Sequence, residues 1–175
     1  MIDLGFNNLG FLNLSLIYGA FTLSASFVDL IIKKIGVKAT LCLAATSYAI
    51  WELSFFLPSY RHEELLDRPE EELGIFSDSL IVSIFLFTGF LLGMGAGPLW
   101  VAQAYYISEC ANDTNKGLYN SLCISIFQIS QFSSSTMTFL LLSRIGKSNF
   151  YLLMGLVGVA GALMFMSLPH PQKSC

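Results

Sequence analysis

Polar side chains that could bind a ligand or a partner occur inside long apolar stretches of this sequence. Trp100, Gln103 and Tyr106 follow one another at three-residue steps in one stretch, and Gln128 and Gln131 repeat that step in another. Residues three or four apart project from the same side of a helix, and an amide has several donors and acceptors to satisfy. These five residues are therefore candidates for a polar cavity or a partner-binding face. Packing between helices is the alternative role.

Two acidic residues also lie within apolar stretches. Asp29 is followed by Lys33 four residues later, a spacing that suits an ion pair on one helix, so a local ion pair is favoured over a transport site. Glu52 lies about a turn and a half before the end of its stretch. A carboxylate at membrane depth needs a partner or water. Glu52 could therefore have a purely structural partner, and proton or cation coupling is the alternative hypothesis.

The sequence contains no motif that indicates an enzyme. The sequence offers no nucleophile–base pair, metal-ligand spacing or cofactor-binding loop, so we expect no enzymatic activity, no cofactor and no metal. No basic tract is present for nucleic acid. Cys42 and Cys123 fall within apolar stretches and are expected to serve as packing residues.

The elements that carry these residues are predicted to be membrane-spanning helices. Hydrophobic residues make up 54% of the chain and charged residues 12%, and about 20 apolar residues suffice to cross the hydrocarbon core. The stretches are too long and too uniformly apolar for barrel strands. We therefore expect an all-α, polytopic membrane helical bundle that forms one transmembrane domain over residues 1–175. Its five spans are predicted at residues 9–32, 37–57, 80–107, 118–142 and 150–168.

The loops suggest an orientation. Residues 33–38, "KKIGVK", are basic and short, whereas residues 58–78 form the one soluble-looking segment, which is acidic. Lys and Arg in short loops favour the cytoplasmic face, which places the acidic loop on the opposite side. Asn112 begins a glycosylation sequon that would then lie in the cytosol.

Rows of small residues predict close contacts between helices, because such residues let helix backbones approach in lipid. One row is predicted on the first span, one on the fourth, and glycine rows on the third and fifth. Their members are Ser15, Gly19, Thr22 and Ser26; Ser121, Ser125, Gln128, Gln131 or Phe132, Ser135 and Thr138; Gly89, Gly93 and Gly97; and Gly155, Gly158 and Gly161.

The stretch "GMGAGPLWVAQAYYIS", followed by "NKGLYNSL" and "FQISQ", resembles the Unc-ninety-three-like ion-channel regulatory family of the major facilitator superfamily. The most specific part is the Leu-Trp-x-Ala-Gln core, which ends at Gln103. Residues 14–25 and 33–50 are similar to the second and third helices of that family. The sequence departs from the pattern at Ala104, where Gly is usual, and at Cys123-Ile124, where a Phe-Trp pair is common.

The resemblance implies that the five spans correspond to helices two to six of a twelve-helix facilitator. We thus expect an N-terminal half that lacks the first helix and the second half. It also implies an accessory protein that regulates an ion channel, in particular a potassium channel, by binding a membrane-protein partner. The partner would be a channel or receptor, or the missing second half of a facilitator fold.

Two alternatives stay open. One is a secondary transporter of a small solute or ion, as part of a longer chain, with Gln103, Gln128 and Gln131 along its route. The other is a scaffold subunit of a larger membrane complex. All three hypotheses place the protein in a lipid bilayer as a multi-pass membrane protein.

Overall fold

The computed structural model describes residues 8–64, 77–112 and 114–169, and these residues form helices without any strand. The predicted all-α class is therefore confirmed. The helices are α1 (Leu9–Ser26), α2 (Val28–Ile35), α3 (Val37–Ser54), α4 (Phe56–Glu64), α5 (Asp78–Cys110), α6 (Lys116–Ile145) and α7 (Lys147–Met166).

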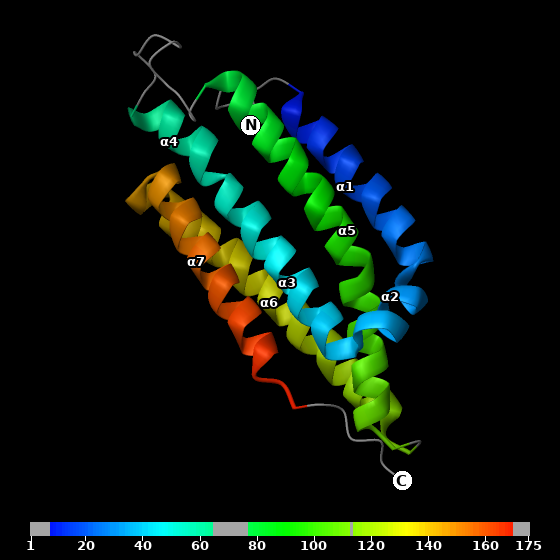
Figure 1. The fold of residues 1–175 in the computed structure, drawn as a ribbon. Coiled ribbons are helices and arrows are strands. Elements are labelled where there is room, and N and C mark those ends of the chain that lie inside the picture. Colours follow the sequence, from blue (N-terminus) through cyan, green and yellow to red (C-terminus); the bar gives the residue numbers. More distant parts are fainter. Residues whose placement is uncertain (1–7, 65–76, 113, 170–175) are drawn as a thin grey trace.

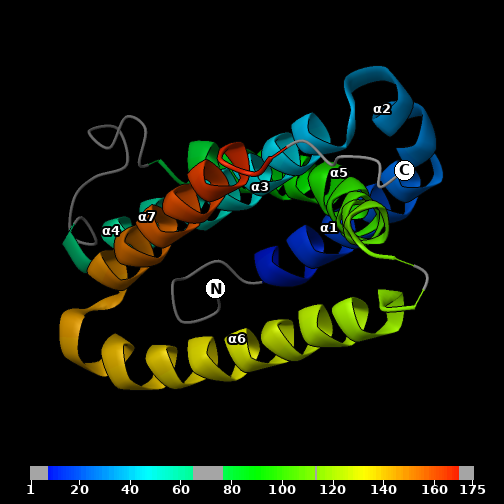
Figure 2. The ribbon, with the colours of Figure 1, turned by 90° about the horizontal axis from the view of Figure 1, so that it is seen from below.

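Four long helices lie side by side in the order α1, α5, α3, α7 (Figure 1). The sixth helix is different. Seen from below the view of Figure 1, α6 runs beside this row of four and stands apart from it (Figure 2), and it makes few contacts with α5 and α7. The bundle therefore contacts α6 at few places, and most of the surface of α6 is exposed.

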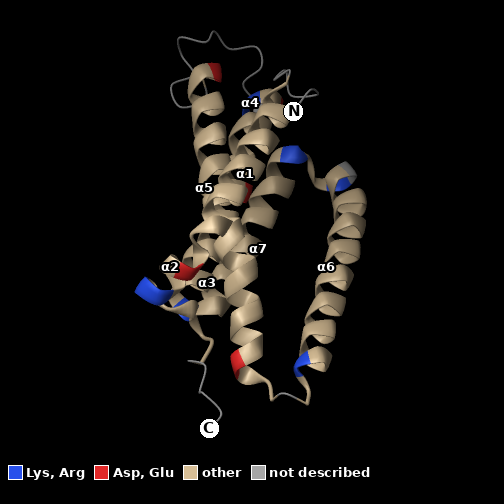
Figure 3. Ribbon diagram, turned by 90° about the vertical axis from the view of Figure 1, so that its right-hand side faces the viewer, with Lys and Arg blue, Asp and Glu red and all other residues tan. Residues whose placement is uncertain are grey.

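The helices are suited to a membrane. Those over Leu9–Ser26, Val37–Glu63, Asp78–Cys110 and Lys147–Met166 are long and apolar enough to cross a bilayer. The charged residues of the described helices lie mostly near the two ends of the bundle (Figure 3). The predicted fourth span, residues 118–142, is present as α6. Its Ser, Thr and Gln residues keep it outside that apolar group, so the number of spans stays a prediction.

Two predicted spans have different limits in the structure. The first divides at Phe27, whose φ of −110° and ψ of 6° leave the helical region, so that α2 turns away from α1. The second ends at Ser54, and α4 continues into the predicted acidic loop. Pro58 lies in the first turn of α4, where a missing N–H is tolerated. The remainder of that loop, residues 65–76, is outside the described residues.

The third predicted span is one continuous helix, α5, through Pro98. Its glycine row contacts α1 closely: a Cβ added at Gly93 would overlap the carbonyl oxygen of Ile17, and one at Gly97 would lie 2.6 Å from Ser24 Oγ. Ser24 Oγ also donates to Gly93 O at 3.1 Å. The predicted packing role of this glycine row is therefore confirmed.

The small-residue row predicted on the first span is not the one that packs. Ser15, Gly19, Thr22 and Ser26 are exposed, and a Cβ at Gly19 would meet nothing within 4 Å. The buried side of α1 carries Asn13, Ala20 and Ser24 instead. Both sides of α1 offer small residues, so spacing alone did not identify the one that faces α5.

Candidate functional site

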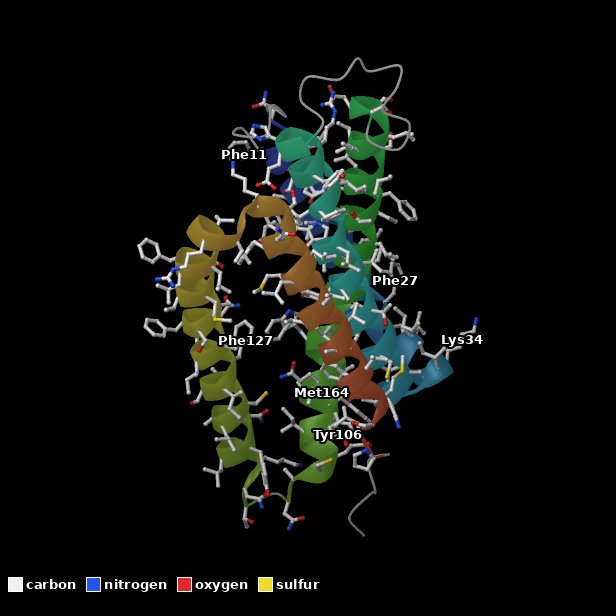
Figure 4. The ribbon with its side chains drawn as sticks, turned by 90° about the vertical axis from the view of Figure 1, so that its left-hand side faces the viewer. Phe11, Phe27, Lys34, Tyr106, Phe127 and Met164 are labelled. Carbon is white, nitrogen blue, oxygen red and sulfur yellow. The ribbon has the colours of Figure 1, made fainter. Side chains whose placement is uncertain are left out.

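The candidate residues of α5 divide between two neighbours. Gln103 Nε2 donates to Sγ of Cys123 on α6 at 2.7 Å, and Trp100 meets Phe127 edge to face, with ring centroids 4.9 Å apart. In Figure 4, Phe127 lies on the side of α6 that faces the other helices. Trp100 and Gln103 thus hold α6 against α5.

Tyr106 belongs to a different environment. Its hydroxyl donates to Pro169 O at 3.0 Å, and its ring packs against the buried cluster of Val37, Leu41 and Ala102. Figure 4 shows it at the lower end of α5, beside the end of α7. The structure therefore separates Tyr106 from Trp100 and Gln103.

Gln128 and Gln131 are both exposed on α6. Neither side-chain amide has a hydrogen-bond partner within the part of the chain that the structure describes. Their places on α6 differ. Gln131 lies one turn after Phe127 and shares its face, whereas Gln128 is turned about 100° from Phe127.

The surface of α6 has three faces. The inner face is fixed by contacts with the bundle through Cys123, Phe127, Ser134 and Thr138, and the exposed Gln131 lies at its edge. About a third of a turn away is the outer polar face: Ser121, Ser125, Gln128, Phe132 and Ser135. The third face is apolar and exposed: Leu122, Ile126, Ile129 and Leu140. The predicted row on this helix is thus split, because Thr138 lies on the inner face, whereas Phe132 continues the outer polar face.

Glu52 is half-buried on α3 and lines a pocket of about 340 Å³ between α3, α6 and α7. Its carboxylate lies against Gly158 of α7, where an added Cβ would overlap Oε2. Gly155 receives the side chain of Leu53 in the same way, whereas Gly161 meets nothing within 4 Å. The glycine row of the fifth span therefore packs on α3 through two of its three members.

Asp29 has no such environment. It is exposed in the first turn of α2, where a negative charge is favourable beside the free N–H groups. The predicted ion pair with Lys33 is absent, since the one ion pair among the described residues joins Arg61 to Asp78. The break at Phe27 places Asp29 and Lys33 on a separate short helix, with both side chains exposed.

The sequence analysis missed a buried polar junction. Asn13 is 2% exposed; its Nδ2 donates to Phe85 O at 2.6 Å, and its Oδ1 accepts from Trp51 Nε1 at 3.3 Å. These bonds join α1, α5 and α3. The signal was an Asn in an apolar helix, since a buried amide requires hydrogen-bond partners.

A second missed contact joins α4 to α7. The carboxylate of Glu63 accepts from the backbone N–H groups of Lys147, at 2.6 Å, and Ser148, at 3.1 Å. The first N–H groups of a helix have no partner within it, so Glu63 caps α7 from a distant part of the chain.

Comparison with known proteins agrees with the motif at Leu99–Gln103. The chain is 32% identical over 105 residues to protein unc-93 homolog A of Xenopus laevis and 31% identical over 105 residues to its human counterpart. It is 28% identical over 113 residues to an UNC93-like protein of Schizosaccharomyces pombe. The chain is a distant, partial homologue of UNC93 proteins. No family model and no solved structure matches it.

The matched regions cover 59%, 59% and 65% of this chain, but 18%, 18% and 19% of the three relatives. The chain thus spans less than a fifth of the length of the curated relatives it matches. Together with the four apolar helices, the similarity establishes a multi-pass integral membrane protein.

Proposed function

We propose that this protein is an accessory subunit that binds a potassium channel within the membrane through the outer polar face of α6. The observation that carries the proposal is the exposed side-chain amide of Gln128, which has no hydrogen-bond partner within the described residues. The channel is the partner class that the family resemblance implies.

The course of the chain supports a membrane position for α6. Both α5 and α7 are apolar enough to span, and they run in the same direction, while α6 connects the lower end of α5 to the upper end of α7 (Figures 1 and 3). A chain that crosses twice in one direction must return between the two crossings. With 30 residues, α6 is about 45 Å long, which is sufficient.

A membrane position makes the outer polar face a contact surface. An amide that faces hydrocarbon without a partner costs several kcal/mol, whereas the apolar face with Ile126 and Ile129 suits lipid. The serines at positions 121 and 125 also allow a second helix to approach closely, in the small-xxx-small spacing of helix pairs. The surface therefore fits a transmembrane helix of a partner that offers a hydrogen bond to Gln128.

Co-expression with potassium-channel subunits tests the proposal. The variant Gln128→Leu removes the amide and keeps the apolar volume, and Ile129→Leu, on the apolar face, is the matched control. An interhelical hydrogen bond is worth about 1–2 kcal/mol, so Gln128→Leu should weaken co-purification with the channel roughly 5- to 30-fold and reduce the effect on potassium current. The control should behave as the unmodified protein.

Equal binding by Gln128→Leu and the unmodified protein would contradict the assignment of this face. Binding to no potassium-channel subunit would contradict the assignment of the partner.

A further inference from the structure

The pocket beside Glu52 combines a charge, hydroxyls and aromatic rings around a cavity. It lies between α3, α6 and α7 and has a volume of about 340 Å³. This is within the range of small-molecule sites and corresponds to about ten water molecules. A bare metal ion would not fill it.

Glu52 supplies the charge. Its carboxylate has no hydrogen bond or ion pair from any residue that the structure describes, and it lies beside the side-chain-free backbone at Gly158. Within a membrane-spanning bundle, an unpaired carboxylate is costly. A positively charged occupant would offset that cost.

The hydroxyl groups that α6 contributes to the pocket are arranged as acceptors. Ser134 Oγ donates to Gln131 O at 3.1 Å, and Thr138 Oγ1 donates to Ser134 O at 2.8 Å. Because each hydroxyl proton is used within α6, the oxygen lone pairs are what remain for a ligand. An occupant that bonds to these two oxygens must therefore bring its own donors.

Aromatic rings complete the lining. Trp51 contacts Phe55 edge to face at 4.8 Å, and Phe55 stacks on Tyr151 at 5.2 Å with 18° between the ring planes. Aromatic faces attract organic cations. No group of three or more His, Cys, Asp or Glu side chains suited to a metal occurs among the described residues, so multidentate metal binding lacks its ligands here.

We propose that this pocket binds a small organic ammonium ion, with Glu52 as the counter-ion and Ser134 and Thr138 as hydrogen-bond acceptors. The ammonium group would contact Glu52 and the apolar body would lie against the aromatic lining. This site is separate from the outer polar face of α6 and does not depend on the proposed channel partner.

Fluorescence of Trp51 reports on the pocket directly. The chain contains two tryptophans, so Trp100→Phe leaves Trp51 as the single reporter and keeps an aromatic ring against Phe127. The protein is reconstituted in nanodiscs and titrated with 2-phenylethylammonium at neutral pH. We expect a saturable change in Trp51 emission, and we expect the neutral analogue 2-phenylethanol to bind about tenfold or more weakly.

Glu52→Gln, in the same single-tryptophan background, keeps the shape of the side chain and removes its charge. It should weaken binding of the amine about tenfold or more, whereas Asp29→Asn, at an exposed acid on α2, should leave binding unchanged. Unchanged affinity in Glu52→Gln, or no saturable binding to the parent protein, would overturn the proposal. A response to sodium chloride with none to the amine would also overturn it, in favour of an inorganic cation.

A second variant covers the case in which Glu52→Gln loses helical structure by circular dichroism. The double substitution Ser134→Ala and Thr138→Val removes both acceptors from the exposed helix α6. It should weaken binding of the amine severalfold. Retention of full affinity in that variant would count against the site.

Discussion

The side-chain amide of Gln103 on α5 donates to Sγ of Cys123 on α6 at 2.7 Å. One turn further along α6, the ring of Phe127 meets Trp100 edge to face. These contacts determine which way α6 faces. Because Gln128 follows Phe127 directly, its side chain is turned about 100° from the contact with α5, and a partner can reach it without displacing α6.

The contact between α1 and α5 depends on Gly93. A Cβ at Gly93 would overlap Ile17 O and lie 2.7 Å from Cβ of Ala20, so Gly93→Ala should lower the free energy of unfolding by about 1–3 kcal/mol. Gly19→Ala, where a Cβ meets nothing within 4 Å, is the control and should not destabilise. Unfolding in mixed micelles with increasing SDS measures both. Equal stability of the two variants would contradict the described packing.

Asn13 and Trp51 should be energetically coupled. The Trp51 indole donates to Asn13 Oδ1 at 3.3 Å, and Asn13 Nδ2 donates to Phe85 O at 2.6 Å. Asn13→Leu should cost about 1–2 kcal/mol of stability, since it removes the bond to Phe85 O and leaves the indole N–H of Trp51 without its partner. A double-mutant cycle with Trp51→Phe should give a coupling energy of about 0.5–1.5 kcal/mol. Strict additivity of the two substitutions would show that this bond contributes nothing.

Glu63 should stabilise the start of α7. Glu63→Ala removes the acceptor for Lys147 N and Ser148 N and should cost about 0.5–2 kcal/mol, as other lost helix caps do. Glu63→Gln keeps one acceptor oxygen and should cost less. The control is Asn149→Ala, because that exposed side chain bonds only to Ile145 O. Hydrogen exchange at Lys147 and Ser148 provides the readout, and unaltered protection in Glu63→Ala would refute the capping role.

Much of the helical framework was predictable from the sequence. Hydropathy is local, so the helices over residues 80–107 and 150–168 were located within a few residues, and the glycines at 89, 93 and 97 identified a packing face. The break at Phe27 was not predictable. No Pro or Gly precedes it in "LSASFVDL", and the change of direction depends on how α2 packs on α3 and α5.

The sequence predicted which polar residues belong to the candidate site better than it predicted how they are arranged around the helices. Spacing grouped Gln128 with Gln131, which lie only about 60° apart around the helix. In the structure Gln131 lies nearer the contact with α5, and Gln128 lies further from it. Which face turns inward depends on the contacts of Cys123 and Phe127 with α5, which lie far apart in sequence from their partners. The pocket at Glu52 is likewise formed by residues of three helices. The sequence pattern of any single helix therefore does not predict it.

Photo-crosslinking from α6 tests the central claim most directly. A photoreactive amino acid replaces Gln128 on the outer polar face in one variant and Ile129 on the apolar face in another, in cells that also express a potassium-channel subunit. The proposed association predicts a covalent adduct with the channel subunit from position 128 and lipid adducts alone from position 129. Lipid adducts alone from both positions, or an adduct from position 128 with a second copy of this chain instead of the channel, would contradict it.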